Sequence, residues 1–445
     1  MSRFAVNNLP IEMFALWLLE LALSYYLAYT LLGSGVSATG LQGAVANQAF
    51  VLALTVGLTA FLIGLYRPAV FSRTRGMLVN TALGGLLAFP AAWIVSRALG
   101  IDADRIVGHD SLWPLKIVLA WIAALFATRL LFLMAVRSNL FVRRIAIMGS
   151  TGAMGPTVAA VRTSQRGFIE VVAGPDADAS PDDLRRAGVL DVVVSTTARS
   201  AMPQDVVAAF TARGITIETE TEFWERHLKR VDVAHIDENW VRLLDSASAG
   251  RLQEFVNRVG DIGISLALLV FTAPLMIIVA LLVHFDSPGP VLYRQERVGR
   301  GGIPFTILKF RSMSANAEAG GPAWAVQRDP RVTRIGSLMR RTRIDELPQL
   351  FNVLRGQMSF IGPRPERPHF VTQLAEQIPF YRERARVKPG LTGWAQVNFP
   401  YGASVEDARV KLSYDLYYVR HRSPLLDLAI LFATVRVILF QEGSR

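Results

Sequence analysis

Residues 264–283 read ISLALLVFTAPLMIIVALLV, a stretch of twenty residues that is almost entirely apolar and carries a proline at position 274. This length is enough for a helix to cross a bilayer, which takes ~20 apolar residues. Pro274, however, lies mid-stretch, where it removes a backbone donor and kinks a helix. Arginines flank both ends, and a crossing would put one flank outside, against the positive-inside bias. The pattern therefore favours a re-entrant helix that bends at Ala273–Pro274. A fifth crossing with a tolerated kink is the alternative.

Four other apolar runs fill the first third of the chain and predict four membrane-spanning helices. They cover residues 11–32, 50–66, 77–99 and 112–136. The loop at 66–76 and the exit after the fourth run each carry three arginines, whereas the loop at 100–111 carries three aspartates and one arginine. Short basic loops stay in the cytoplasm, so we expect the 66–76 loop and everything after residue 137 to be cytoplasmic. Glu12 and Glu20 in the first run are candidates for functional intramembrane acids.

Composition separates the membrane part from the charged part. The 445 residues are 51% hydrophobic and 19% charged, with a net charge of +11 and no cysteine. Disulfides, zinc–thiolate sites and cysteine nucleophiles are thereby excluded. Residues 285–445 hold 24 basic and 14 acidic side chains, a charge of +10 that accounts for nearly all of the excess. This charge fits a face near anionic lipid headgroups or a pocket for a phosphorylated substrate. Nucleic-acid binding has no supporting motif.

The middle of the chain has the pattern of an α/β domain. Apolar strands are expected at 144–148, 169–173, 191–195 and 215–218, and the first ends in Gly149-Ser-Thr-Gly152-Ala-Met-Gly155 before a helical pattern. Strand, glycine turn and helix is the layout that cradles a dinucleotide pyrophosphate. The spacing here is Gly-x-x-Gly-x-x-Gly, and Glu170 is the nearest candidate for the acidic ribose partner. A Rossmann-like fold that binds no ligand is at least as well supported as a cofactor site.

Asp345 and Glu346 are the strongest candidates in the sequence for catalytic or metal-binding carboxylates. Leu347, Leu350, Phe351 and Leu354 recur at helical spacing, which predicts a helix with Asp345 near its N-cap and Gly356 near its end. Capping and dipole complementarity alone explain such a pair. Several nearby arginines add a second interpretation, in which the carboxylates serve as a nucleophile or a Mg²⁺ ligand in phosphate chemistry.

Motifs in the last third resemble those of one known family. From about residue 254 to 440 the chain resembles the bacterial sugar transferases, the polyprenyl-phosphate glycosyl-1-phosphate transferases. The four preceding helices and the Rossmann-like domain resemble the long form of that family, and the segment at 399–408 resembles its exopolysaccharide-initiating subgroup. The matching stretches are Lys309–Met313, Asp345–Leu354, Gly362–Pro365, Pro389–Asn398 and Leu412–Tyr418.

The resemblance implies a Mg²⁺-dependent reaction at the cytoplasmic face of the bacterial inner membrane. A UDP-sugar gives its hexose 1-phosphate to undecaprenyl phosphate and releases UMP, which begins exopolysaccharide or capsule synthesis. Asp345 takes the role of the nucleophile that forms an aspartyl phosphosugar, and Glu346 positions it or shares the metal. The matching substrate-binding positions are Lys309, Arg311, Arg340, Arg364, Gln396 and Asn398. A homodimer is also compatible with the long form.

The predicted fold class is a membrane α-helical protein with α/β domains. We expect four transmembrane helices in 1–140, a Rossmann-like domain in 141–235, a linker and re-entrant helix in 236–284, and a catalytic α/β domain in 285–445 that ends in an interfacial helix. The chain departs from the family pattern after Asn398, where Phe399-Pro400-Tyr401 replaces a segment that carries an arginine in short members. Two other interpretations remain: a single-displacement transferase in which Asp345 only binds metal, and a membrane scaffold or nucleotide sensor.

Overall fold

The computed structural model describes two compact units, residues 1–228 and 229–445. The described residues are 11–33, 42–62, 65–66, 113–138, 142–148, 169–172, 180–246, 250–314, 329–399 and 404–439, with isolated positions between 81 and 97 and at 157, 161 and 402.

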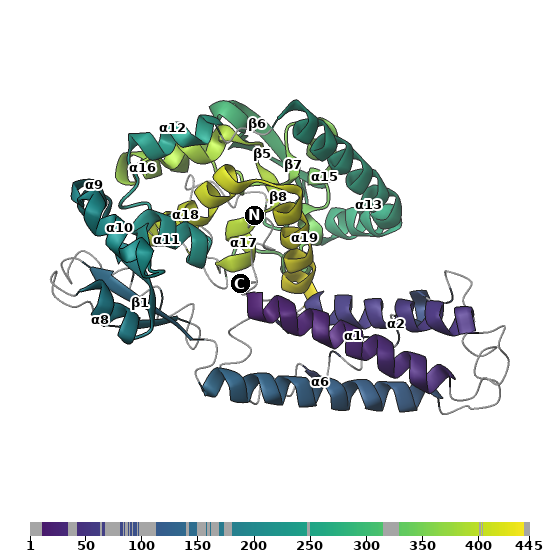
Figure 1. Ribbon diagram of the computed structural model, residues 1–445. Helices are drawn as coiled ribbons and strands as arrows, with labels where there is room; N and C mark the ends of the chain where they lie inside the picture. The colour runs from purple at the N-terminus through teal and green to yellow at the C-terminus, as the bar shows by residue number, and fades with distance from the viewer. Residues whose placement is uncertain are drawn as a thin grey trace. The chain divides into compact units, whose positions relative to one another are not determined.

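Three long apolar helices begin the first unit: α1 (Ile11–Gly33), α2 (Gln42–Leu62) and α6 (Trp113–Arg137). They correspond to the first, second and fourth apolar runs, while most of the third run, 77–99, lies outside the described residues. The helix α2 begins eight residues before the expected start at position 50. The earlier turns belong to the helix because Val45, Gln48 and Ala49 are buried in it. Figure 1 shows α1 lying beside both α2 and α6, and residues of α1, α2 and α6 share one apolar core.

An ion pair inside this unit links α1 to α6. Glu20 and Arg129 are both almost fully buried, with Glu20 Oε2 lying 3.1 Å from Arg129 Nη2. Glu20 also accepts hydrogen bonds from Tyr66 Oη at 2.6 Å and from Thr128 Oγ1 at 2.8 Å. A buried carboxylate with this many partners is satisfied as a structural group. The contacts therefore favour a structural role for Glu20 over the functional one considered from the sequence.

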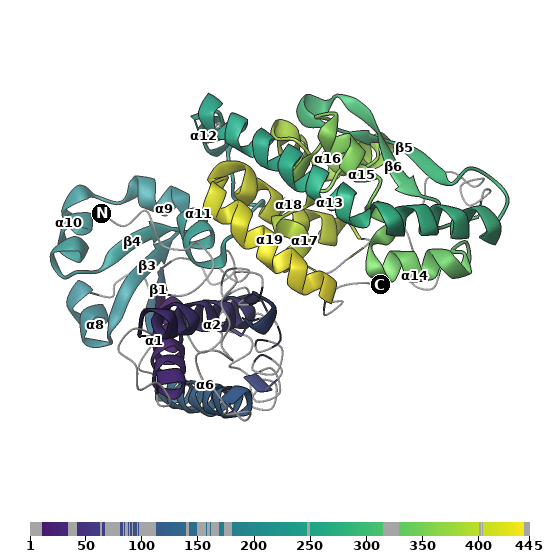
Figure 2. The same ribbon diagram turned by 90° about the vertical axis from the view of Figure 1, so that its right-hand side faces the viewer.

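A four-stranded parallel sheet follows, with the strand order β2-β1-β3-β4. All four expected strands are present within two residues of the expected bounds. Apolar side chains cover both faces of the sheet, as Figure 2 shows with α8 and α10 on one side and α11 on the other. The elements are β1 (Arg143–Met148), β2 (Ile169–Val172), α8 (Pro181–Arg186), β3 (Val189–Val194), α9 (Thr196–Ala201), α10 (Gln204–Ala212), β4 (Thr216–Thr219), α11 (Glu220–Phe223) and a π-helical turn at Trp224–Leu228.

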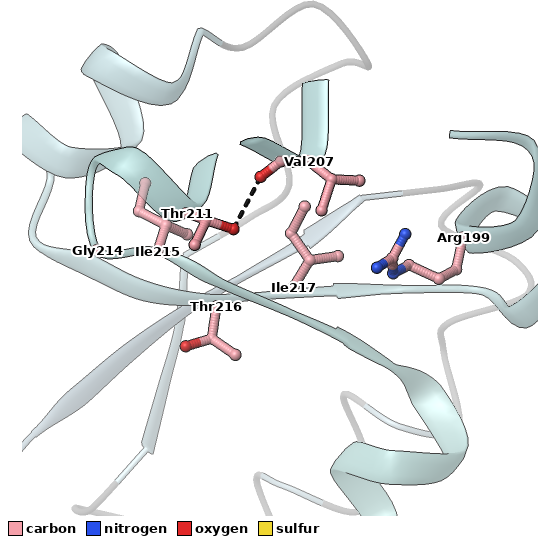
Figure 3. Close-up of a pocket in the computed structure, with 7 residues that line it drawn as sticks. All are labelled: Arg199, Val207, Thr211, Gly214, Ile215, Thr216 and Ile217. Atoms are coloured by element: carbon pink, nitrogen blue, oxygen red, sulfur yellow. Dashed lines mark hydrogen bonds between the residues drawn. The ribbon is translucent and has the colours of Figure 1, made fainter. Parts of the chain in front are cut away.

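The features expected to bind a dinucleotide are not assembled in the described part of this sheet domain. The glycine turn at 149–155 lies outside the described residues. Glu170 forms an ion pair with Arg144 at 3.0 Å, so its carboxylate already has a partner. A cavity of about 270 Å³ lies between α10 and β4 and is lined by Arg199, Val207, Thr211, Gly214, Ile215, Thr216 and Ile217 (Figure 3). It contains none of the predicted site residues.

The second unit combines short strands with helices around one large apolar core. A β-hairpin, β5 paired with β6, and a parallel pair, β7 with β8, make up its sheets. The elements are α12 (Glu238–Ser246), α13 (Arg251–Asp286), β5 (Leu292–Val298), β6 (Pro304–Phe310), α14 (Arg334–Thr342), α15 (Gln349–Leu354), β7 (Ser359–Ile361), α16 (Pro368–Gln377), β8 (Gly390–Thr392), α17 (Trp394–Asn398), α18 (Val405–His421) and α19 (Pro424–Leu439), with 3₁₀ turns at Arg300–Gly302, Ile344–Glu346 and Tyr381–Arg386.

The helix α13 contains the stretch with Pro274 and is 36 residues long. Many of its apolar side chains are open to the surroundings; Val270 is 77% exposed and Phe271 is 85% exposed. Together with α1, α2 and α6, it is one of four described helices long and apolar enough to cross a membrane. Apolar side chains exposed on this scale mark a membrane-facing surface, and the chain is a membrane protein.

The last helix, α19, is partly buried in the core. Leu426 and Ile430 are buried in it, whereas Leu425 and Leu428 on the same helix are about half exposed. The helix therefore packs on the domain by one side and offers apolar groups on another. This placement is compatible with the predicted interfacial helix, and equally with a terminal helix that packs on the domain core.

Replacing Glu20 by Leu should destabilise the first unit, because Arg129 is then left buried without its carboxylate. Breaking a buried ion pair from one side costs about 3–5 kcal/mol. We expect a clear drop in the melting temperature of the detergent-solubilised protein, followed by tryptophan fluorescence. The double variant Glu20→Leu, Arg129→Leu should recover most of the loss. A wild-type melting temperature for Glu20→Leu alone would show that the pair does not stabilise the helices.

Candidate active site

The two carboxylates lie in a 3₁₀ turn between two helices. The helix α14 ends at Thr342, and Arg343 follows in the left-handed region with φ of 59°. Ile344–Glu346 then form a 3₁₀ turn, and α15 begins only at Gln349. The prediction that Asp345 caps the helix is therefore wrong, because the left-handed residue and the 3₁₀ turn move the helix start three residues further on. The expected stop is present, since Gly356 has φ of 81° just after α15.

The buried side of α15 also differs from the predicted one. Leu350 is buried as expected, but Phe351 is 42% exposed and the polar Gln349 and Asn352 are buried instead. Asn352 accepts a hydrogen bond from Leu308 N at 3.0 Å and donates one to Thr306 O at 2.7 Å. Its side chain thus acts as an extra pairing partner for β6. This contact fixes α15 against β6, the strand that carries Lys309.

Glu346 is surrounded by basic groups from three parts of the chain. Its Oε1 lies 2.6 Å from Arg364 Nη2, 3.2 Å from Lys309 Nζ and 3.8 Å from Arg343 Nη1. Arg364 Nη1 also reaches Oε2 at 3.4 Å. The Glu346 side chain is only 13% exposed, so these contacts are shielded from water and interact more strongly than surface pairs.

The electrostatic surroundings shift the pKa values of the two neighbouring carboxyls in opposite directions. Burial alone would raise the pKa of Glu346, but the charges of Arg364 and Lys309 outweigh it and hold that pKa well below its ordinary range. Burial, and next the charge of Glu346, raise the pKa of Asp345. Lys309, Arg340 and Arg364 act in the opposite direction on Asp345. Environments that shift the pKa values of two adjacent carboxyls in opposite directions are typical of groups with different roles in one site.

Asp345 is the less engaged member of the pair. It is 6% exposed, and its Oδ1 atom has no hydrogen-bond partner among the residues that the structure describes. A buried oxygen in this state calls for an explanation. Carboxylate oxygens are the ligands that Mg²⁺ prefers, so this Asp345 oxygen fits the ion, whereas the Glu346 oxygens are already occupied by cations. The same Asp345 oxygen is also available to attack the phosphorus atom of a substrate.

The structure brings together five of the predicted site residues. Lys309 comes from β6, Arg340 from the last turn of α14, and Arg364 from the loop after β7. Arg340 acts on Asp345 through its charge, while the other two contact Glu346. Burial lowers the pKa of Lys309, an effect that the Glu346 charge opposes. These residues with Asp345 and Glu346 form one cluster, which we call the carboxylate site.

The remaining predicted residues are held elsewhere. Arg311 donates to Val283 O at 3.1 Å and to Ser287 O at 2.6 Å, so it lies at the end of α13. Gln396 donates to Leu391 O at 3.0 Å, and Asn398 donates to Trp394 O at 2.9 Å. Their hydrogen bonds serve α13 and the segment around α17. The Oε1 atom of Gln396 is buried with no hydrogen-bond partner among the described residues.

Sequence reasoning missed the supporting role of Arg343 and Asn352. Arg343 was visible as one of four residues in the basic run 340–343, but nothing in the run distinguished it from its neighbours. Asn352 is a polar residue between the apolar Phe351 and Val353. Its polarity within an apolar pattern is the sequence signal that could have pointed to a buried hydrogen bond. Only its partners on β6 reveal what it does.

Comparisons with known proteins confirm the family that the motifs predict. The model of the bacterial sugar transferase family matches residues 252–441. A UDP-N-acetylgalactosamine-undecaprenyl-phosphate N-acetylgalactosaminephosphotransferase of Aeromonas hydrophila is 42% identical over 50% of this chain and 57% of its own length. A UDP-glucose:undecaprenyl-phosphate glucose-1-phosphate transferase of Escherichia coli K12 is 41% identical over 44% of this chain and 42% of its own length.

A third relative is matched over nearly its whole length. The exopolysaccharide production protein PSS of Rhizobium leguminosarum bv. phaseoli is 43% identical over 40% of this chain and 93% of its own length. The match to the Aeromonas protein, by contrast, spans little more than half of that protein. Because the Rhizobium relative is covered over nearly its whole length and the family model includes every residue of the carboxylate site, the chain belongs to the bacterial sugar transferase family, with Asp345 and Glu346 in the part that the family model matches, its transferase domain.

Proposed function

We propose that this protein transfers a sugar 1-phosphate from a UDP-sugar to undecaprenyl phosphate and releases UMP, as the first step of exopolysaccharide or capsule synthesis. The observation that carries the proposal is the carboxylate site, where Asp345 keeps an unpartnered oxygen beside a fully paired Glu346. The names of the Aeromonas and Escherichia relatives support the donor and acceptor classes. The proposed sugar is a hexose, and N-acetylgalactosamine is the alternative that the Aeromonas name supports.

The first step is attack by the Asp345 carboxylate on the phosphorus that carries the sugar. One Asp345 oxygen forms a bond to phosphorus, the bond from phosphorus to the bridging oxygen breaks, and UMP leaves with that oxygen. A carboxylate can act in this way without a general base because its reactive form is the ionised one. The unpartnered Oδ1 suits attack, since no hydrogen bond to a described residue has to be broken first.

The second step returns the enzyme to its starting form. An oxygen of the lipid phosphate attacks the phosphorus of the aspartyl phosphosugar, and the Asp345 carboxylate leaves. The product is a sugar joined to the lipid through a diphosphate. Both steps develop negative charge on phosphate oxygens, and phosphoryl transfer depends mainly on positioning and charge stabilisation. Arg340 and Arg364 are the cations proposed to supply it, with Lys309 and Glu346 holding the arrangement.

Mg²⁺ is part of the proposal as the metal that Asp345 and Glu346 would hold. When bound, it would neutralise charge on the diphosphate of the donor. Asp345 is the better candidate for the ligand, because Lys309, Arg343 and Arg364 already lie against the oxygens of Glu346.

The membrane helix supports a re-entrant arrangement with the site on the cytoplasmic side of the inner membrane. Before Pro274, Arg258 donates to Val353 O at 2.6 Å, and Asp261 accepts from Phe360 N at 2.7 Å. After Pro274, Val283 packs with Phe310 in one apolar cluster. Both flanks of the apolar stretch are thus attached to the same compact unit, which supports the re-entrant arrangement over a crossing. The arginine-rich loops of the sequence give the proposed orientation.

The middle sheet domain keeps its Rossmann-like assignment as part of the proposal. The strand order β2-β1-β3-β4, all parallel, is that of the first four strands in the doubly wound order 2-1-3-4-5. We assign it no ligand.

Replacing Asp345 by Asn should lower kcat/KM for UMP release by roughly 10⁴-fold or more, as losses of covalent nucleophiles do. The assay uses the purified full-length protein with a panel of UDP-sugars and undecaprenyl phosphate. Asp237→Asn is the matched control, because Asp237 caps α12 through Trp240 N and asparagine caps a helix equally well. If Asp345→Asn retains substantial turnover, Asp345 is not the nucleophile.

Isotope exchange distinguishes this two-step reaction from a single displacement. With a covalent intermediate, wild-type protein should exchange labelled UMP into the UDP-sugar in the absence of lipid acceptor, because the first step is reversible on its own. A single-displacement enzyme needs both substrates at once. Lack of exchange alongside normal turnover would favour that alternative, and lack of any turnover with every UDP-sugar would contradict the function itself.

Cysteine labelling tests the re-entrant arrangement, since the chain has no native cysteine. Arg251→Cys and Pro288→Cys place thiols at exposed positions on the two flanks of the apolar stretch. We expect both to react with a membrane-impermeant maleimide only after the cells are permeabilised. Ser37→Cys, in the loop that the sequence assigns to the periplasm, is the control that reacts in intact cells. Labelling of the Pro288→Cys variant in intact cells would show that the helix crosses.

A further inference from the structure

The loop Gly362–Glu366, which carries Arg364, is anchored along its whole backbone. Gly362 N donates to Thr392 O at 2.8 Å, and Gly390 N donates to Pro363 O at 2.9 Å. At the other end, Val298 N donates to Glu366 O at 2.9 Å. The prolines at 363 and 365 have no N–H group, so the loop depends on its carbonyl oxygens for attachment.

Two buried arginines bind the middle carbonyls of this loop. Arg384 Nη2 donates to Arg364 O at 2.9 Å, and Arg297 Nη1 donates to Pro365 O at 3.0 Å. Every carbonyl from Pro363 to Glu366 therefore has a donor, and the donors come from β5, β8 and the 3₁₀ turn after α16. A loop held from several directions keeps its side chains in one place.

Arg384 is itself held on two other sides. Its Nη2 lies 2.7 Å from Asp415 Oδ2, and its Nη1 donates to Tyr381 Oη at 2.8 Å. The guanidinium also lies 5.2 Å from the centre of the Tyr381 ring. The Arg384 side chain is 11% exposed and that of Asp415 is 2% exposed. A planar guanidinium bound in this way cannot rotate without breaking several contacts.

We propose that Arg384 is a positioning residue for the transfer reaction, which sets the place of Arg364 at the carboxylate site by holding the Arg364 carbonyl. The inference rests on the proposed function, because it gives Arg364 a role at the reacting phosphate. Among the described residues, the contact that links Arg384 to the site is the one with the main chain of Arg364, whose guanidinium lies 2.6 Å from Glu346. Misplacing such a group by about 1 Å can cost ~10²-fold in rate.

A double-mutant cycle tests the proposal in the full-length protein with UDP-sugar and undecaprenyl phosphate. Arg384→Lys keeps the charge but loses the planar fork, and we expect kcat/KM to fall by about 10- to 100-fold. Arg364→Gln should also reduce kcat/KM. Because Arg384 acts through Arg364, the double variant should be no slower than Arg364→Gln alone, within about threefold. Losses that multiply, or wild-type activity for Arg384→Lys, would overturn the proposal.

Two further variants separate positioning from general stability. Arg382→Lys, an exposed neighbour in the same 3₁₀ turn, should behave like wild type. Tyr381→Phe removes one hydroxyl contact of Arg384 and keeps the buried ring. We expect a smaller loss of kcat/KM, which disappears when Arg364→Gln is already present. A Tyr381→Phe loss that persists in the Arg364→Gln background would show that the effect does not pass through Arg364.

A structure of the Arg384→Lys protein provides a readout that is independent of turnover. The proposal predicts that the contact between Arg364 and Glu346 is lost or lengthened while α14 and α15 keep their places. An unchanged contact would overturn it. If the wild-type protein turns over no UDP-sugar, the proposed function fails, and this structural comparison still decides whether Arg384 positions Arg364.

Discussion

The arrangement of the transferase domain depends on the pairing of Glu346 with three cations. Lys309 comes from a hairpin strand, Arg343 from the residue before the 3₁₀ turn, and Arg364 from a loop some twenty residues further along. A buried carboxylate is costly unless such partners are present, and the largely buried Lys309 is in turn costly without Glu346. The contacts of Glu346 with these three cations therefore hold the hairpin, the 3₁₀ turn and the loop together. The adjacent Asp345 keeps an oxygen without a hydrogen-bond partner among the described residues, which supports its proposed role as the nucleophile.

The membrane helix is built into the same domain by polar contacts. Arg258 donates through Nη1 and Nη2 to the carbonyls of Val353 and Leu354 at the end of α15. At the far end of α13, Arg311 donates to Val283 O and Ser287 O. Arg311 follows directly after β6, the strand of Lys309. The helix and the carboxylate site are therefore parts of one structure, which suits the proposed reaction, in which the acceptor phosphate is attached to a membrane lipid.

Much of the fold follows from local patterns in the sequence, and much of the site does not. The strands of the sheet domain and the helices α1 and α6 follow from runs of apolar residues that are visible within each segment of the sequence. The position of Asp345 was misjudged because a left-handed Arg343 is not visible in a helical pattern. The contacts of Asn352 with β6 and of Arg384 with Arg364 join residues 20 or more apart in sequence. Such pairings depend on tertiary structure and cannot be predicted from the spacing of residues along the chain.

The most direct test of the account is the intact mass of the protein after incubation with a UDP-sugar and Mg²⁺ in the absence of lipid acceptor, followed by peptide mapping. The account predicts a mass gain equal to one sugar phosphate, located on the peptide that contains Asp345 and lost when undecaprenyl phosphate is added. An unchanged mass in a preparation that turns over normally with both substrates, or an adduct on another residue, would contradict it.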